Sequence, residues 1–385
     1  MSKIAIIVFY FGEFPWYHQF FINSCYKNET IDFFFFSDQF NEFKQSNNIN
    51  EIPFSFFAFN KLSSEKLGFE VNLKSGLKMC DFRPAFGLIF EDYLIGYDFW
   101  GYSDTDIILG RLREFLDEEN LKNDFISVVP YYPSGFFAVF RNNLKMKYLF
   151  QKSNDYKDAF LSIENTLFEE CGGYYNEVMN GVNILETNSP IQTFHHVLEM
   201  NKNVKSLFEY FSIEGNPNGV KYNNGVLTLY NKYEIMMYHL TNFKTNYFFN
   251  KKFKVKSYDD YKFYSYCIND NFFLKNIFCN VNCFFIKFKF YCMRKFDKLI
   301  SKNMKKEKLI GKYNYMQGYV EILQKDNYYE AVGDLNGVVL NSVFDSNLCF
   351  IKNTDLYFYE NNKNLHLILK SGQVLVYKRC DDSVF

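Results

Sequence analysis

The stretch that most constrains the fold of this chain lies at residues 3–12. Every residue from 4 to 11 is aliphatic or aromatic, and a glycine stands at position 12. An unbroken apolar run that ends at glycine is typical of a parallel strand buried on both faces. The run resembles a signal peptide only in being apolar, because no small-residue cleavage site follows it. We therefore expect a first strand in the interior of an α/β sheet.

Alternating helical and β-prone segments follow this first strand. Residues 15–25 have a helical pattern with proline near the first turn, and residues 31–37 and 52–59 are β-prone. Further β-prone runs occupy residues 99–103, 125–130 and 134–142. A strand-helix-strand beginning is typical of Rossmann-like α/β sheets. The predicted fold class is therefore α/β, with a Rossmann-type sheet and flanking helices.

Two carboxylates directly follow the run 99–103. Asp104 and Asp106 are spaced i, i+2, and an apolar run ending in glycine comes after them. Side chains with this spacing at the end of a strand can converge on one cation that prefers oxygen ligands. The same pattern also occurs as a solvated turn or a helix cap. The pair lies between apolar segments, and the chain before it has the pattern of a nucleotide-binding α/β half. We therefore favour a metal site that could hold a diphosphate.

Several phosphate-binding and hydrolytic motifs are absent from the sequence. It has no Gly-x-x-x-x-Gly-Lys-Ser/Thr loop, and its first strand is not followed by Gly-x-Gly-x-x-Gly. A P-loop nucleotidase and a dinucleotide-dependent oxidoreductase are therefore disfavoured. His-Glu-x-x-His and Gly-x-Ser-x-Gly are missing as well. Phosphate binding through a metal ion fits the sequence better than phosphate binding through a glycine-rich loop.

Net charge, cysteine usage and hydropathy narrow the class of protein. The net charge of −1 over 385 residues gives no case for nucleic-acid binding. The nine cysteines are odd in number and contain no Cys-x-x-Cys, which indicates reduced, mostly buried thiols. No uncharged apolar stretch approaches about 18 residues, the length that a membrane-spanning helix needs. We therefore expect a cytoplasmic protein without a nucleic-acid partner.

The composition of the chain changes after about residue 245. Residues 251–310 contain fifteen Lys and Arg against five Asp and Glu, interleaved with Phe and Tyr. Such a segment is most often a solvated helical face, but it could also lie on an anionic membrane, where a lipid-linked acceptor would be found. We predict three parts: a domain over residues 1–245, a basic aromatic helical segment over 246–310 and a small β-rich part over 311–385.

Four spaced blocks of the sequence carry a resemblance to a known family. They are residues 78–87, residues 100–106, the strand 134–142 and the dipeptide Tyr238-His239. Their order resembles bacterial GT-A-type glycosyltransferases, which are mostly uncharacterised and found among cell-surface polysaccharide genes. The resemblance covers about residues 3–245. It implies a GT-A-like glycosyltransferase domain over this part of the chain.

The resemblance further implies a UDP-linked sugar donor that is bound together with Mn²⁺ or Mg²⁺. Asp106 would ligate the metal ion, Asp104 would contact the ribose or the metal shell, and His239 would complete the ligand set. Both aspartates would act in catalysis, since the ion neutralises the diphosphate and stabilises the charge that develops as it leaves. From the residues alone, the favoured reading of His239 is a partly buried histidine in an aromatic helix.

Five residues are predicted to line the donor pocket beside the metal. Arg83 would offer a planar cation to phosphate or sugar, Asp81 would accept sugar hydroxyls, and Lys78 would serve the same anion. Tyr10 ends the first strand, where ligands of open α/β sheets bind, and could stack on the base. Ser103 completes this set. The alternative reading of Asp81 and Arg83 is a structural ion pair at a helix break.

An inverting transferase needs a carboxylate that takes the proton from the acceptor hydroxyl. In this fold such a base usually lies after the strand that corresponds to 134–142, and we assign it to Glu177. Glu169, Glu170 and Asp158 compete for this role. A retaining enzyme can work without such a base, so the stereochemical outcome stays open.

The predicted activity is transfer of a hexose, such as galactose in its pyranose or furanose form, from a UDP-sugar to a surface polysaccharide or a lipid-linked glycan. The basic segment 251–310 would hold the enzyme at the inner face of the plasma membrane. One alternative is a metal-dependent nucleotidyltransferase or sugar-nucleotide hydrolase, although residues 9–13 are a poor version of a nucleotidyltransferase loop. The other alternative is a non-catalytic glycan-binding protein.

Overall fold

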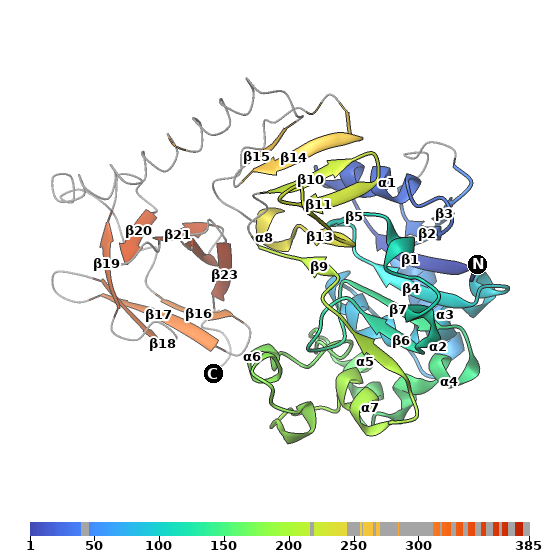
Figure 1. Cartoon of the computed structure of the whole chain (residues 1–385). Coiled ribbons are helices and arrows are strands. Elements are labelled where there is room, and N and C mark those ends of the chain that lie inside the picture. The colour runs from blue at the N-terminus through green and yellow to red at the C-terminus, as the bar shows by residue number, and fades with distance from the viewer. Residues whose placement is uncertain are drawn as a thin grey trace. The chain divides into compact units, whose positions relative to one another are not determined.

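The computed structural model describes residues 1–39, 46–215, 219–244, 255, 257–264, 267–269 and 284, together with the backbone of eight C-terminal strands (Figure 1). The chain divides into two compact units. The first consists of Met1–Ile213 and Lys221–His239, and the second of Glu214–Val220 and Leu240–Phe385. The boundaries at 245 and 310 stay a prediction, and most of the basic segment 251–310 lies outside the described residues.

A seven-stranded sheet forms the centre of the first unit (Figure 1). In sheet order its strands are β3 (Ile49–Pro53), β2 (Asp32–Ser37), β1 (Ile4–Tyr10), β4 (Phe99–Ser103), β7 (Phe137–Arg141), β6 (Phe125–Ser127) and β8 (Ser206–Phe208). β7 is antiparallel to β4 and β6, whereas the other neighbouring strands pair in parallel. This largely parallel sheet with flanking helices confirms the predicted α/β fold class.

β1 lies in the interior of this sheet and is buried on both faces, as its apolar run predicts. Ile4, Ile6 and Val8 belong to one apolar core. Ala5 and Ile7 belong to another. Because successive side chains of a strand point to opposite faces, the sheet separates these two cores. β1 thereby anchors both layers of the unit.

Helices cover both faces of the sheet. α1 (His18–Tyr26) packs with the core of Ile4. α2 (Phe56–Leu67), α3 (Phe86–Ile89), α5 (Tyr156–Leu161) and α7 (Phe194–Met200) pack with the core of Ala5. Further helices are α4 (Leu144–Lys147), α6 (Tyr175–Met179), η1 (Leu77–Ala85), η2 (Glu91–Leu94), η3 (Leu112–Glu114), η4 (Asn120–Lys122), η5 (Leu149–Lys152) and η6 (Ile184–Glu186). Among the described residues, no helix has both the length and the apolar character that crossing a bilayer requires.

The strand expected over residues 52–59 is wrong in its second half. β3 ends at Pro53, and the following residues begin helix α2. Ser55 is the cause, because its hydroxyl accepts a hydrogen bond from the amide of Ala58 at 3.2 Å and caps the first turn. A capping residue in the middle of an apolar run therefore divides the run between a strand and a helix.

A smaller sheet in the first unit joins three distant segments. β5 (Ile107–Leu109) pairs antiparallel with β13 (Met237–His239), and β13 pairs in parallel with β9 (Ser212–Ile213). Nearby in the chain, β10 (Val220–Asn223) and β11 (Val226–Leu229) are hydrogen-bonded neighbours, and β12 (Tyr233–Glu234) pairs antiparallel with β11. β5 continues directly from the acidic pair, so this small sheet sets what lies beside that pair.

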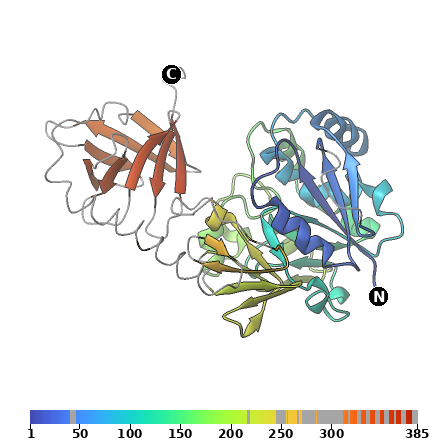
Figure 2. The ribbon, with the colours of Figure 1, turned by 90° about the horizontal axis from the view of Figure 1, so that it is seen from above.

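The second unit contains α8 (Thr241–Lys244), the antiparallel strands β14 (Asp260–Tyr264) and β15 (Cys267–Asn269), and a closed barrel of eight strands (Figure 2). Successive barrel strands pair antiparallel, and the first strand closes the barrel by pairing with the last. They are β16 (Gly311–Tyr315), β17 (Gly318–Gln324), β18 (Tyr329–Gly333), β19 (Val338–Ser342), β20 (Leu348–Ile351), β21 (Tyr357–Asn361), β22 (Asn364–Ile368) and β23 (Val374–Arg379). The C-terminal part is β-rich, as predicted.

Candidate metal centre

Three potential metal ligands converge at one edge of the first unit. Asp104, Asp106 and His239 each offer a ligand atom, and these atoms all lie within 4.8 Å of one another. Asp106 and His239 are buried, whereas the Asp104 side chain is 34% exposed. The Nε2 atom of His239 lies 3.3 Å from the Oδ2 atom of Asp106. The cluster thus has a buried side and a side that faces solvent.

The local sequence and the strand register together explain this convergence. β4 ends at Ser103, and the amide of Asp104 donates to the carbonyl of Phe136 at 2.8 Å, which fixes the exit of the chain from the sheet. Asp106 directly precedes β5. In the antiparallel pairing of β5 with β13, His239 lies opposite Ile107. The register therefore places His239 beside Asp106, at the end of a strand and not in the helix considered from the residues alone.

The donor set of this cluster suits a divalent cation. Carboxylate oxygens are the ligands that Mn²⁺ and Mg²⁺ prefer, and imidazole is a further common ligand of divalent transition metals. Buried carboxylates are costly unless a positive charge lies near them. Asp104, Asp106 and His239 therefore fit a resident ion chemically and electrostatically.

Arg83, in η1, connects to this cluster through Asp104. Its Nη2 atom donates to the Asp104 carboxylate, its Nη1 atom lies 3.9 Å from Glu169, and its guanidinium lies over the Tyr102 ring at 5.3 Å from the centroid. Burial alone would lower the pKa of Arg83, but Asp104, Glu169 and other neighbouring groups together outweigh burial and raise it. Arg83 is therefore a permanent cation at the site. It pairs with Asp104, which differs from the ion pair with Asp81 considered from the sequence.

Lys78 and Asp81 pair with each other. Both side chains are buried, and Lys78 Nζ lies 2.5 Å from Asp81 Oδ2. Asp81 also accepts hydrogen bonds from the amides of Thr166 and Phe168. The Asp81 carboxylate is thus hydrogen-bonded to groups of the protein itself. This differs from the expectation that it would accept sugar hydroxyls.

Tyr10 and Ser103 lie at the same strand ends as the cluster. Tyr10, the last residue of β1, is half-buried, and its hydroxyl donates to the Glu13 carbonyl at 3.1 Å. Its ring centroid lies 5.3 Å from that of Phe14. Ser103 is buried, and its hydroxyl donates to the carbonyl of Asp104 at 2.9 Å. Stacking of Tyr10 on a base stays a prediction.

Glu177 is exposed on α6, and its assignment as a base stays a prediction. Two competing carboxylates, Glu169 and Glu170, are electrostatically coupled to Arg83. Glu170 accepts hydrogen bonds from the Gly135 amide at 2.8 Å and from the hydroxyl of Tyr175. Burial raises the pKa of Glu169 well above its usual range and also raises that of Glu170. These two carboxylates are therefore poised to hold protons.

Tyr17 belongs to the surroundings of the cluster although sequence reasoning did not single it out. Burial raises the pKa of its phenol, and the charges of Asp106 and Asp104 raise it further. A phenol that responds to both carboxylates lies in the field of the cluster. The only sequence signal was its place near the start of the first helix, which does not distinguish it from other aromatic residues there.

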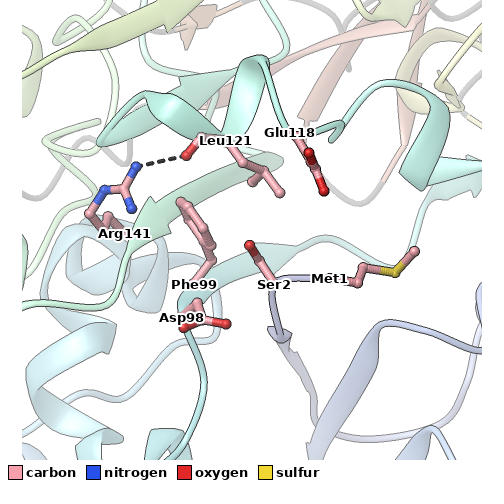
Figure 3. Close-up of a pocket in the computed structure, with 7 residues that line it drawn as sticks. All are labelled: Met1, Ser2, Asp98, Phe99, Glu118, Leu121 and Arg141. Atoms are coloured by element: carbon pink, nitrogen blue, oxygen red, sulfur yellow. Dashed lines mark hydrogen bonds between the residues drawn. The ribbon is translucent and has the colours of Figure 1, made fainter.

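A cavity of about 390 Å³ lies at the opposite ends of the same strands (Figure 3). Its lining residues are Met1, Ser2, Asp98, Phe99, Glu118, Leu121 and Arg141. Phe99 begins β4 and Arg141 ends the antiparallel β7, so the cavity is separated from Asp104 by the length of β4. The cavity and the ligand cluster are therefore different places in the fold.

Comparison with solved structures finds glycosyltransferases at low similarity. A galactosyltransferase, LgtC, in complex with donor and acceptor sugar analogs is 13% identical, with a TM-score of 0.30 over 55% of this chain and 75% of that chain. A glycosyltransferase involved in the glycosylation of the major capsid of PBCV-1 is 9% identical, with a TM-score of 0.33 over 62% and 93%. The apo-form glycosyltransferase GlyE of Streptococcus pneumoniae TIGR4 is 14% identical, with a TM-score of 0.24 over 54% and 45%. Similarity at this level does not define a function.

Comparison at the level of sequence gives one family. No curated protein sequence matches the chain. A family model matches residues 6–277, which include the whole candidate metal centre. The chain therefore belongs to the family of unknown function DUF6625.

Proposed function

We propose that this protein is a metal-dependent glycosyltransferase that moves a hexose from a UDP-sugar to a glycan acceptor. The observation that carries the proposal is the convergence of Asp104, Asp106 and His239 where β4 leaves a largely parallel sheet. Ligands of open α/β sheets bind beyond the carboxyl ends of the strands. The ligand cluster lies at that edge, where a sugar nucleotide would be expected.

Each residue of the cluster has a proposed task. Asp106 and His239 would hold the ion from the buried side of the cluster, and Asp104 would reach the ion or the ribose from the exposed side. When bound, Mn²⁺ or Mg²⁺ supplies positive charge that neutralises the diphosphate of the leaving group. Arg83 holds Asp104 and adds a fixed positive charge next to the phosphates. Tyr10 ends the neighbouring strand β1 and offers its ring to the base.

Transfer to the acceptor requires that the acceptor hydroxyl loses a proton as it attacks the anomeric carbon. In an inverting reaction a carboxylate takes this proton, and Glu177 is our candidate, with Glu169, Glu170 and Asp158 as competitors. Glu170 is held by Gly135 and Tyr175, so its position is well defined. In a retaining reaction these carboxylates would not need to act as a general base.

The acceptor and the place of action are proposed from the sequence. The acceptor would be a bacterial surface polysaccharide or a lipid-linked glycan, and the hexose could be galactose as a pyranose or a furanose. The basic segment 251–310 would hold the enzyme at the cytoplasmic face of the membrane. Co-sedimentation with anionic liposomes tests this, since a chain without 251–310 should stay in the supernatant, and equal sedimentation of both chains would refute it.

Thermal unfolding with UDP and Mn²⁺ tests the core of the proposal. Ligand binding to the folded state alone should raise the melting temperature by on the order of 5 °C at saturating UDP plus Mn²⁺. Asp106→Ala should lose this gain, whereas Asp124→Asn, at the far end of the sheet, should keep it. A wild-type protein without any gain from UDP plus Mn²⁺ would contradict the proposal. Release of UDP rather than UMP from a UDP-sugar separates transfer from nucleotidyl chemistry.

A further inference from the structure

The carboxylate of Asp81 is a buried junction between two segments of the first unit. Asp81 lies in η1, is fully buried, and receives the Nζ atom of Lys78 at 2.5 Å. The amide of Thr166 donates to its Oδ2 atom at 3.0 Å, and the amide of Phe168 donates to its Oδ1 atom at 2.9 Å. Lys78 in turn donates to the carbonyl of Glu164 at 2.8 Å. One ion pair thus joins η1 to residues 164–168.

Leu167 shows that this junction holds the chain in an unfavourable conformation. Its φ angle is 54°, in the left-handed region that β-carbon sterics disfavour for every residue except glycine. The two amides that bond to Asp81 belong to the residues on either side of Leu167. Strained residues persist where surrounding contacts determine the backbone. The carboxylate of Asp81 supplies such contacts on both sides of Leu167.

The junction adjoins Arg83 and Glu169, two charged residues whose contacts lead to the metal centre. Arg83 follows Asp81 by two residues in η1, and Glu169 directly follows Phe168. Arg83 lies 3.9 Å from Glu169 and contacts Asp104. A shift of the turn at Leu167 relative to η1 would therefore move Glu169 with respect to Arg83, and Arg83 with respect to Asp104.

We propose that Lys78 and Asp81 are positioning residues of the metal centre. Their buried ion pair sets the distance between Glu169 and Arg83 and thereby the orientation of Asp104. This inference rests on the proposed function, because it requires that Asp104 meets a cation or a nucleotide. It assigns both residues a role through their neighbours and no contact with the ligand.

Mn²⁺ affinity in the presence of UDP tests this inference. The affinity can be followed by the electron paramagnetic resonance signal of free Mn²⁺ in titrations of wild-type protein, Asp81→Asn and Asp124→Asn. Asp81→Asn keeps the shape of the side chain but loses the charge that faces Lys78 and one acceptor. Asp124 is a matched control, since it likewise accepts hydrogen bonds from three donors, here two cationic side chains and one backbone amide, but at the far end of β4. We expect an affinity at least 10-fold weaker for Asp81→Asn and an unchanged affinity for Asp124→Asn.

The outcomes separate this inference from the proposed function. If wild-type protein binds Mn²⁺ with UDP and Asp81→Asn binds within two-fold of it, the positioning role is refuted. Equal weakening in Asp81→Asn and Asp124→Asn refutes it too, because a general loss of stability would then explain both. If wild-type protein itself binds no Mn²⁺ with UDP, the proposed function fails, and the inference fails with it.

A second pair of variants covers the case in which Asp81→Asn does not fold. Leu167→Gly removes the backbone strain, because glycine adopts the left-handed region freely. The folded state then depends less on the two amide contacts of Asp81. In this background, adding Asp81→Asn should still weaken Mn²⁺ binding at least 10-fold relative to Leu167→Gly alone. Equal affinity of the single and the double variant would overturn the proposal.

Discussion

Two arginine–carboxylate pairs lie at opposite ends of β4, and they differ in what surrounds them. At the end of the strand, Arg83 contacts Asp104 and lies over the ring of Tyr102. At its beginning, Arg141 contacts Asp124 at 3.2 Å and lies over the ring of Phe99, 4.8 Å from the centroid. The local construction is the same, with a guanidinium on an aromatic ring of β4 and a carboxylate beside it.

The partners of the two arginines differ in kind. Arg141 also donates to the carbonyls of Leu121 and Asn123 at 2.7 and 3.1 Å, and the first of these bonds is drawn in Figure 3. Burial would raise the pKa of Asp124, but hydrogen bonds from Lys145 and its other donors outweigh it and lower the pKa. The carboxylate at this end is therefore fully compensated by the protein.

Acidic side chains gather at the other end. Arg83 contacts Asp104, which lies beside Asp106, and it also interacts electrostatically with Glu169 and Glu170. Burial and neighbouring carboxylates raise the pKa of Glu169 well above its usual range. A divalent cation nearby would favour the ionised form of these carboxyl groups. The comparison teaches that the same local pair serves a structural joint at one end of β4 and adjoins a cluster of potential metal ligands at the other.

The largest difference is expected when an aspartate at either end of β4 is replaced by the uncharged asparagine. Asp106→Asn removes an anionic ligand and should weaken Mn²⁺ binding at least ~100-fold, which corresponds to about 2.7 kcal/mol. Asp124→Asn should leave Mn²⁺ binding unchanged and lower only the free energy of unfolding. Titration calorimetry measures the first quantity and urea unfolding the second. Similar Mn²⁺ affinities for both variants would break the distinction between the two ends.

Conservative substitutions of the two arginines should separate affinity from stability. Arg83→Lys keeps the charge but loses the planar fork, and we expect Mn²⁺ plus UDP to bind about 10-fold more weakly. Arg141→Lys should cost about 1–2 kcal/mol of unfolding free energy, because the carbonyls of Leu121 and Asn123 lose donors. Calorimetry and urea unfolding of both variants check this. An Arg141→Lys protein with weakened Mn²⁺ binding would contradict the separation.

His195 is buried and belongs to neither arginine–carboxylate pair. It should lower the free energy of unfolding in acid. Burial lowers the pKa of His195 from 6.5 to about 4, with Glu199 raising it and His196 lowering it. Below pH 6.5 the unfolded chain takes up a proton that the folded His195 refuses, so stability falls between pH 6.5 and about pH 4. At pH 5 the loss is roughly 2 kcal/mol.

Replacement of this histidine tests the sign and the size of that loss. His195→Phe should reduce the fall in unfolding free energy between pH 7 and pH 5, measured with urea. Part of the fall should stay, because burial also lowers the pKa of His18 to about 4. A variant with the same pH dependence as wild-type protein would show that His195 is protonated in the folded state at pH 5.

The smallest effect is expected at an exposed pair, which gives a baseline for both ends of β4. Arg111 meets Glu234 through two hydrogen bonds of 2.7 and 2.6 Å, but 47% of the arginine side chain is exposed. Water screens such a pair, so Glu234→Gln should change the free energy of unfolding by less than about 1 kcal/mol. A larger loss in urea unfolding would mean that geometry outweighs exposure in this protein.

Local patterns predicted the elements that depend on neighbours in the chain. The apolar run of β1 and the acidic pair after β4 are visible in the sequence, because burial on both faces and the strand period leave a direct mark on residue types. The sequence pattern did not predict the boundary between β3 and α2. Apolar residues lie on both sides of Ser55, so the pattern reads as one strand although Ser55 caps a helix. The role of Glu177 stays a prediction.

The sequence by itself determined the α/β class, the interior place of β1 and the position of Asp104 and Asp106 at the end of a strand. The tertiary structure decided which side chains meet them. His239 reaches Asp106 only through the register of β13 on β5, and Asp81 is paired with Lys78, while Arg83 turns to Asp104. Register and ion pairing between distant segments depend on how whole layers pack, and no local pattern of residues encodes that packing.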